Sequence, residues 1–253
     1  IEARVRAAGN ADEFFAYDKQ CLAKKIPANV GQPFVIRCVV PESVAHIVVE
    51  DLIRGTVNFD RSQFDDFIII RSDGSPTYNF SVVVDDIFMQ ITHIIRGEEH
   101  LVNTPKQIIL YEACNATPPR FAHIPLILSP NGGKLSKRDG SVDVLQYKAD
   151  GYLPDALINY IVRLGWSQGD QELFTQQELI DSFTLEAVGK KSGVFDTQKL
   201  QWVNGVYLKK LTPQACLAFL VADVDPQLKT KLSHLIKSLL AIRIIYVCII
   251  NID

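Results

Sequence analysis

The run Ile91-Thr-His-Ile-Ile-Arg-Gly-Glu-Glu-His100 passes directly from apolar residues to a charged turn. Its first five residues have the composition of a strand that is buried on both faces. Asn103-Thr-Pro105 follows, with Thr104 suited to cap a helix and Pro105 suited to its first position. A strand, a charged turn and a helix in this order predict one α/β unit.

Similar apolar runs lie on both sides of this unit. Tyr78–Val84 ends in three valines and is followed by two aspartates, which predicts a buried strand that opens at its carboxyl end. Phe121–Leu128 predicts another strand. Ligands of open α/β sheets bind beyond the carboxyl ends of the strands, so Arg96, Glu98 and the loop after Leu128 are candidate site residues.

The loop after Leu128, Asn131-Gly-Gly-Lys-Leu-Ser-Lys-Arg-Asp-Gly-Ser141, carries three cations between glycines. Lysines on a glycine-rich backbone are compact positive charges suited to phosphate oxygens. A basic run of this length is equally typical of a solvated loop tip or of a general nucleic-acid contact. The loop by itself suggests polyphosphate binding. Only the surrounding sequence can distinguish that role from a solvated loop tip or a general nucleic-acid contact.

The remaining sequence predicts a β-rich part first and a helical part last. Residues 1–25 predict a helix, and short β-branched and aromatic runs then predict four strands, at Phe34–Val40, His46–Asp51, Thr56–Phe59 and Phe67–Ile70. Further helices are predicted at Val142–Ala149, at Pro154–Leu164, after the capping box Thr175–Glu178, at Thr197–Val203 after Asp196, and from Thr212-Pro213 to Leu220. An all-α part is therefore expected from near residue 150.

Composition favours a soluble protein of the cytoplasm. The 253 residues are 47% hydrophobic and 22% charged, which is typical of one or two globular domains. Five widely spaced cysteines without a Cys-x-x-Cys pair, and no secretion signal, favour reduced thiols. The apolar run Leu239–Ile252 is interrupted by Arg243, so no membrane span is expected.

Charge is distributed unevenly along the chain. Residues 187–253 contain nine Lys/Arg and four Asp/Glu, whereas residues 1–186 contain 17 Lys/Arg and 25 Asp/Glu. A basic segment on an acidic body can hold a polyanion on one side only. Chance unevenness among surface charges explains the same numbers equally well.

Six motifs occur in order along the chain. They are Arg71-Ser-Asp-Gly-Ser-Pro-Thr-Tyr-Asn-Phe80, Val82-Val-Val-Asp-Asp86, the run Ile91–His100, Asn103-Thr-Pro105, Lys134-Leu-Ser-Lys-Arg138, and Tyr152-Leu-Pro-Asp-Ala156 with Leu164-Gly-Trp166. In this order they resemble bacterial or organellar glutamyl-tRNA synthetases over roughly residues 30 to 210. The resemblance implies a class I aminoacyl-tRNA synthetase, which forms glutamyl adenylate from ATP and L-glutamate and transfers glutamate to tRNA(Glu).

The resemblance also implies an architecture. We expect an α/β fold, namely the C-terminal part of a Rossmann-like nucleotide-binding fold with a small β-rich insertion, followed by an all-α stem-contact domain. Residues 1–75 would form the inserted acceptor-binding unit and residues 76–150 the second half of the catalytic domain. Residues 151–253 would form the helical stem-contact region and the start of an anticodon-binding domain. The resemblance fades beyond Leu211 and is absent from residues 241–253.

For ATP, the resemblance assigns roles to a loop and to one histidine. Lys134-Leu-Ser-Lys-Arg138 resembles the family's second signature loop, which folds over the phosphates. Lys137 and Lys134 are the expected catalytic cations, and Ser136, Arg138 and His100 are expected ATP contacts. Ser136 is also explained as a turn hydroxyl and His100 as a histidine at a helix start. Mg²⁺ is expected to accompany ATP.

For glutamate, the resemblance assigns roles to an arginine and a tyrosine. Arg96 resembles the arginine that binds the side-chain carboxylate of glutamate, where a bidentate pair would reject neutral glutamine. Alternatively, Arg96 has a structural role and forms an ion pair with Glu98 or Glu99. Tyr78 resembles a tyrosine of the same pocket, or else is an ordinary sheet aromatic, and Glu98 and Asp85 are possible supporting residues.

The sequence departs from the family pattern in two places. The first signature, His-x-Gly-His, is not found and would be expected upstream of Ile1, so the chain is interpreted as a piece of a longer protein. Tyr17–Cys21 resembles the end of a zinc element, but Ala23 stands where a histidine would help, so no zinc is expected.

Alternative functions also follow from these patterns. A glutaminyl-type or tRNA-modifying relative is one alternative. A catalytically incomplete module that binds the tRNA acceptor stem is another. The expected partners are tRNA(Glu), L-glutamate and ATP, with no membrane, and the protein is expected to be a monomer.

Overall fold

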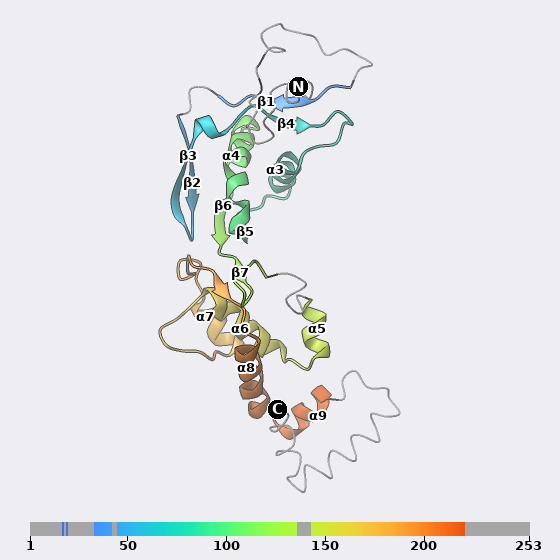
Figure 1. Cartoon of the computed structure of the whole chain (residues 1–253), viewed down its shortest axis with the longest axis vertical. Helices are drawn as coiled ribbons and strands as arrows, with labels where there is room; N and C mark the ends of the chain where they lie inside the picture. Colours follow the sequence, from blue (N-terminus) through green and yellow to red (C-terminus); the bar gives the residue numbers. More distant parts are fainter. Residues whose placement is uncertain (1–16, 18, 20–32, 42–44, 136–142, 221–253) are drawn as a thin grey trace. The chain divides into compact units, whose positions relative to one another are not determined.

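The computed structural model describes residues 17, 19, 33–41, 45–135 and 143–220. The chain divides into two compact units, residues 1–124 and 125–253, which are described separately below (Figure 1). The helix predicted over residues 1–25 and the apolar run Leu239–Ile252 lie outside the described residues, apart from the isolated positions 17 and 19. Among the described residues, no helix is long and apolar enough to cross a membrane.

The first unit contains a four-stranded sheet in the order β3-β2-β6-β5. β2 (His46–Asp51) and β3 (Gly55–Asp60) form an antiparallel hairpin. β6 (Arg120–Ile124) runs parallel to β2 on one side and to β5 (His93–Gly97) on the other. The carboxyl ends of β2, β6 and β5 therefore meet at one edge of the sheet, where ligands of α/β sheets bind.

A second, two-stranded sheet pairs β1 (Ile36–Cys38) with β4 (Phe67–Ile70) in antiparallel fashion. All four strands predicted between residues 34 and 70 are confirmed, two of them with the predicted bounds. They do not form a separate β-rich sheet, because β2 pairs with β6 from much later in the chain. The sheet thus extends across the domain boundary expected at residue 75, and that functional boundary remains a prediction.

The strand predicted at Tyr78–Val84 is wrong: this segment belongs to helix α3 (Tyr78–Phe88). The three consecutive valines have a strong preference for strands, which favoured that prediction. Only one of them, Val83, is buried, and it packs in the core together with Phe80 and Ile87. These positions follow a helical spacing of three and four residues, so tertiary packing overrides the local preference.

Two short 3-10 helices connect the strands and helices of the first unit. A short 3-10 helix, η1 (Arg61–Gln63), follows β3, and a second, η2 (Glu98–Asn103), follows β5 and leads into α4 (Thr104–Ala113). Asn103 stands at the cap position and Thr104 is the first helical residue, one position later in the helix than predicted. Figure 1 shows α4 beside the β2–β3 hairpin and next to α3. The core between them contains Val83, Tyr111 and Phe121.

The second unit is mainly helical. Its elements are β7 (Ile127–Leu128), α5 (Val144–Ala149), α6 (Pro154–Gly165), α7 (Gln176–Ser182), β8 (Gly193–Val194), α8 (Thr197–Lys210) and α9 (Pro213–Leu220). All the helices predicted beyond residue 142 are confirmed, although α8 is longer than expected. The predicted strand Phe121–Leu128 is two strands, since β6 ends at Ile124 before Pro125 and β7 pairs with β8 in the second unit.

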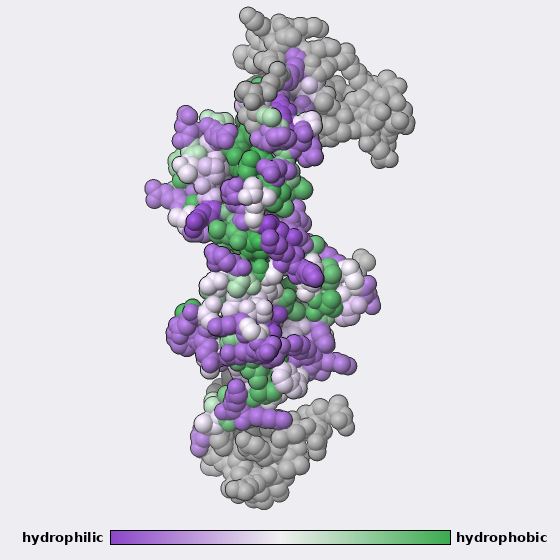
Figure 2. Space-filling view, turned by 90° about the vertical axis from the view of Figure 1, so that its left-hand side faces the viewer, coloured by the Kyte–Doolittle hydropathy of each residue, from purple (hydrophilic) through white to green (hydrophobic). Residues whose placement is uncertain are grey.

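Two apolar clusters stabilise the second unit. Leu200 and Val203 of α8 are buried against Ala156 and Tyr160 of α6. Trp166 and Phe174 pack edge to face in the other cluster, with ring centroids 5.4 Å apart. The face of the protein shown in Figure 2 carries mostly hydrophilic residues with scattered apolar patches, as expected when such clusters hold much of the apolar area inside.

The capping box predicted at Thr175–Glu178 is confirmed and gives a stability prediction. The Thr175 hydroxyl accepts from the backbone N–H of Glu178 at 3.2 Å, and the Glu178 carboxylate accepts from the backbone N–H of Thr175 at 2.6 Å. Thr175→Ala should lower the free energy of unfolding of this unit by ~1 kcal/mol. Trp166 and Trp202 are the two tryptophans of the sequence and both lie in this unit, so urea unfolding followed by tryptophan fluorescence measures the change. The exposed neighbour Gln176, changed to alanine, is the control, and equal midpoints for both variants would contradict the prediction.

Candidate functional site

The guanidinium of Arg96 lies near the carboxyl end of β5 and is held by three neutral groups. Its Nε donates to His123 Nε2 at 3.1 Å, and its Nη2 donates to Thr104 Oγ1 and to Gln107 Oε1, both at 2.8 Å. Gln107 in turn donates to Asn79 Oδ1 of α3 at 3.2 Å. Two strands and two helices therefore fix this one cation.

The charge of Arg96 has no anionic hydrogen-bond partner among the described residues. The alternative in which Glu98 pairs with Arg96 is wrong, because Glu98 forms its ion pair with Arg54. No described carboxylate, including Glu99, forms an ion pair with Arg96. Burial lowers the pKa of Arg96, and Tyr78 and Asp86 nearby partly offset this change. The guanidinium nevertheless stays charged at any relevant pH, so a partly buried positive charge is available to an anionic ligand.

Behind Arg96 lies a buried pair formed by His123 and Asp51. The Nδ1 atom of His123 lies 2.6 Å from Asp51 Oδ2, and neither side chain is accessible to solvent. Asp51 also accepts from the backbone N–H groups of Ile53, Arg54 and His123. Burial raises the pKa of Asp51, but the hydrogen bonds from Arg54, His123 and Ile53 outweigh it, so the pKa is lowered and the carboxylate stays ionised.

Tyr78 and His100, both predicted site residues, lie close to each other and to this cluster. Their ring centroids are 6.2 Å apart, and both side chains reach solvent. Tyr78 begins α3, and its interaction with the guanidinium partly offsets the lowering of the Arg96 pKa by burial. The structure thus brings together Tyr78, Arg96 and His100. Tyr78 is a helix residue, so its alternative role as a sheet aromatic is wrong.

Lys134 belongs to the second unit, where it follows a tight turn. Ser129 accepts from the backbone N–H of Gly132 and donates its own N–H to the carbonyl of Gly133, and Gly132 has φ +85°, which favours glycine. Lys134 forms an isolated antiparallel β-bridge with Leu128, and its side chain is exposed. Ser136, Lys137 and Arg138 lie outside the described residues.

Asp51 and His123 are the residues that sequence reasoning missed. Asp51 closes a predicted strand and His123 interrupts an apolar one, and such a polar residue near the carboxyl end of a buried strand is a usable signal. Their partnership could not be predicted, since the two residues lie 72 positions apart. Asp85, expected as a supporting residue, forms none of the hydrogen bonds described for this cluster.

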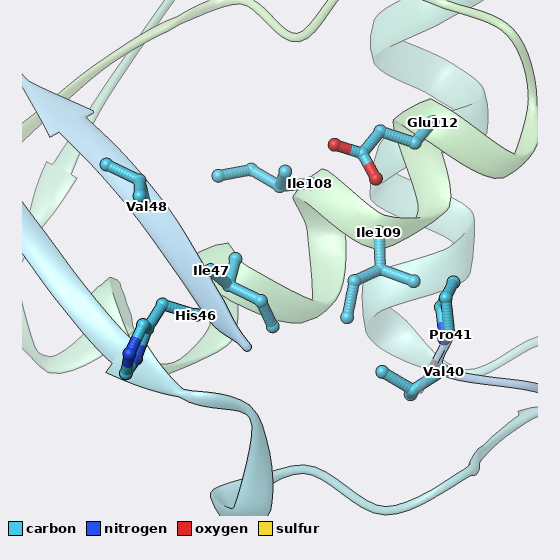
Figure 3. A pocket seen from close by; sticks show the side chains of 8 residues that line it. All are labelled: Val40, Pro41, His46, Ile47, Val48, Ile108, Ile109 and Glu112. Atoms are coloured by element: carbon cyan, nitrogen blue, oxygen red, sulfur yellow. The ribbon is translucent and has the colours of Figure 1, made fainter. Parts of the chain in front are cut away.

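A separate hollow of about 270 Å³ lies between the amino end of β2 and α4. Figure 3 shows its lining side chains, among them Ile47, Val48 and Ile109, with His46 and Glu112 as the polar members. None of the predicted site residues lines it. Because its walls are mainly apolar and its polar groups do not form a cluster around one point, we assign it no chemistry.

The buried pair makes His123 a pH-dependent element. Burial lowers the pKa of His123 below its ordinary value of 6.5, and the attraction of Asp51 only partly offsets this. The unfolded chain therefore binds a proton on this residue at a higher pH than the folded chain does, so its contribution to stability is complete above pH 6.5 and declines below it. An NMR titration of the histidine ring protons should show His123 titrating with a midpoint below pH 6.5, and a midpoint at or above pH 6.5 would contradict this.

Comparison with known proteins identifies the family. Residues 4–202 match the family model of the class I tRNA synthetases (E and Q), catalytic domain. This chain belongs to that family. The synthetase chain is 53% identical over 205 residues to a glutamate–tRNA ligase from Thermodesulfovibrio yellowstonii, an alignment covering 81% of this chain and 43% of the relative.

Solved structures agree with this assignment. The glutamate tRNA ligase from Elizabethkingia meningosepticum, in complex with its amino acid, is 33% identical with a TM-score of 0.70, and the match covers 90% of this chain and 52% of that one. The glutamate–tRNA synthetase from Elizabethkingia anophelis is 33% identical with a TM-score of 0.69, and the match covers 90% of this chain and 53% of that one. The synthetase chain therefore spans about half the length of the relatives it matches. The predicted family and the α/β fold of a class I synthetase catalytic domain are confirmed, and this family uses ATP.

Proposed function

We propose that this chain carries the glutamate-binding and part of the ATP-binding machinery of a glutamyl-tRNA synthetase. The observation that supports this most strongly is the guanidinium of Arg96, which is held at the carboxyl edge of the sheet by neutral groups alone. A desolvated cation of this kind favours a carboxylate ligand over a neutral amide, since the amide would leave the charge without an ionic partner. In this proposal the carboxylate is the side chain of glutamate, and Tyr78 lines the same pocket.

The reaction assigned to the site is adenylate formation followed by transfer. An oxygen of the glutamate α-carboxylate bonds to the α-phosphorus of ATP, and the bond to the β-phosphate oxygen breaks, so pyrophosphate leaves with the electron pair. A ribose hydroxyl of the terminal adenosine of tRNA(Glu) then attacks the carbonyl carbon, and AMP leaves. Lys134 and Lys137 stabilise the charge that builds on the departing pyrophosphate, and Ser136, Arg138 and His100 bind ATP.

Metal ions enter the proposal only with the nucleotide. Mg²⁺ is usually held by substrate phosphates with one or two carboxylates. The described residues contain no group of three or more His, Cys, Asp or Glu that could hold a metal, so no step is routed through Mg²⁺. The absence of zinc stays a prediction, since Cys21 lies outside the described part of the chain.

The wider setting of the protein follows from the same proposal. Residues 1–75 form the acceptor-binding insertion, 76–150 complete the catalytic domain, and 151–253 contact the tRNA stem. The protein acts as a monomer in the cytoplasm, where tRNA, glutamate and ATP are found. The basic balance of residues 187–253 suits a phosphate backbone.

Exchange of labelled pyrophosphate into ATP tests the proposed function. The chain is assayed with L-glutamate or L-glutamine, each with and without tRNA(Glu). Exchange that depends on glutamate and fails with glutamine is the expected result. Binding of tRNA without any exchange would instead favour the acceptor-stem module, and exchange with glutamine would favour a glutaminyl-type enzyme.

A further inference from the structure

The direction of one hydrogen bond fixes the protonation of His123. Arg96 Nε can only donate, so His123 Nε2, 3.1 Å away, has to accept through its lone pair. The ring proton must then sit on Nδ1, which lies 2.6 Å from Asp51 Oδ2, and an ionised carboxylate can only accept. Both contacts are satisfied by one state alone, a neutral imidazole with its proton on Nδ1.

The surroundings hold this state rigidly. His123 is fully buried, and Asp51 is fixed by backbone N–H groups of Ile53 and Arg54 at 2.9 and 2.8 Å. Arg96 and His123 stand opposite each other in the register of the parallel strands β5 and β6, and Asp51 ends the neighbouring strand β2. The hydrogen-bonded side chains of Asp51, His123 and Arg96 therefore come from three adjacent strands, and none of them belongs to a flexible loop.

This arrangement determines which donors of Arg96 remain for a ligand. Nε is engaged by His123, and the two N–H groups of Nη2 are engaged by Thr104 and Gln107. The other terminal nitrogen, Nη1, stands outside these three bonds and carries two N–H groups. Both of the guanidinium edges that could form a fork with a carboxylate include at least one engaged nitrogen. Among these nitrogens, Nη1 is the one that none of the three bonds uses, so it is the donor expected to meet the carboxylate.

We propose that His123, held in one tautomer by Asp51, is a positioning residue that fixes the guanidinium of Arg96 for the carboxylate of its ligand. The proposal rests on the proposed function for the identity of that ligand. It does not require His123 to touch the substrate, and no proton is transferred. Loss of the Nε2 acceptor removes one of the three bonds and leaves the guanidinium held at Nη2 alone, by Thr104 and Gln107. Its orientation is then less well fixed, which weakens ligand binding before it affects the chemical step.

The tautomer is tested on the unaltered chain, independently of any activity. Long-range ¹H–¹⁵N correlation of the imidazoles in ¹⁵N-histidine-labelled protein should show His123 protonated on Nδ1 alone at pH 7.5. Arg96→Lys should shift the Nε2 signal of His123, whereas the exposed His93 should keep its signals. A proton on Nε2, or a doubly protonated ring, would overturn the proposal whether or not the chain activates glutamate.

The kinetic test separates positioning from a general loss of structure. In pyrophosphate exchange, His123→Leu should raise the KM for glutamate about tenfold and leave the KM for ATP within twofold, and His123→Gln, which keeps an acceptor, should recover part of the loss. His93→Gln is the matched control. Equal loss in both KM values, with no recovery by glutamine, would overturn the proposal. Failure of the unaltered chain to exchange, together with the expected tautomer, would refute the proposed function and leave the positioning role standing.

Discussion

Arg96→Gln should lower kcat/KM for glutamate in pyrophosphate exchange by about 30-fold or more. Truncating one partner of a buried, charge-assisted hydrogen bond costs about 2–5 kcal/mol, and each 1.4 kcal/mol corresponds to about tenfold. The guanidinium is half-buried and has no described carboxylate as an ion-pair partner, so the ligand supplies the compensating charge. Steady-state kinetics at varied glutamate concentration measures the loss.

The division of this loss between KM and kcat is informative. If Arg96 binds the carboxylate equally in the ground and transition states, the loss appears as a raised KM with an unchanged kcat. Arg96→Lys keeps a charge but not the three fixed donors, so it should recover only a minor part. Arg120→Gln, at the exposed amino end of β6, is the control and should retain full activity. Activity of Arg96→Gln close to that of this control would refute the assignment of glutamate specificity to Arg96.

The sequence predicted the elements better than their pairing. His46–Asp51 and Phe67–Ile70 were predicted with their observed bounds, because strands of β-branched residues between turn signals leave a clear pattern. The pattern does not say which strands pair. The parallel contact of β2 with β6 rests on the register Asp51 to Phe121, and no local signal records it.

The site was predicted in part for the same reason. Arg96, Tyr78 and His100 belong to motifs within 23 positions of one another, and the structure brings them together. The contribution of Asp51 and His123 to the site could be recognised only from the structure, which aligns β2, β6 and β5 at one edge of the sheet. Tyr78 was placed in the right cluster through the wrong element, since its motif was recognised while the valine run that follows it was interpreted as a strand instead of α3.

Lys137→Ala should slow adenylate formation about 100-fold, through loss of ~3 kcal/mol of transition-state stabilisation. This proposal rests on the motif Lys134-Leu-Ser-Lys-Arg138, in which Lys134 is exposed after a glycine turn and Lys137 lies outside the described residues. Negative charge increases on the phosphates as pyrophosphate leaves, so a cation placed there stabilises the transition state more than bound ATP. Exchange at saturating ATP and glutamate measures the change as a fall in kcat.

The choice of controls decides what the fall in kcat means. Lys137→Arg keeps the charge with a different shape and should retain an intermediate rate. Lys191→Ala removes an exposed lysine of the same unit and should leave the exchange unchanged, since that reaction depends on the phosphates of ATP and not on a tRNA stem. A raised KM for ATP at constant kcat would mean that Lys137 binds the nucleotide without favouring its reaction. The catalytic role would then have to be reassigned, with Lys134 as the next residue to change.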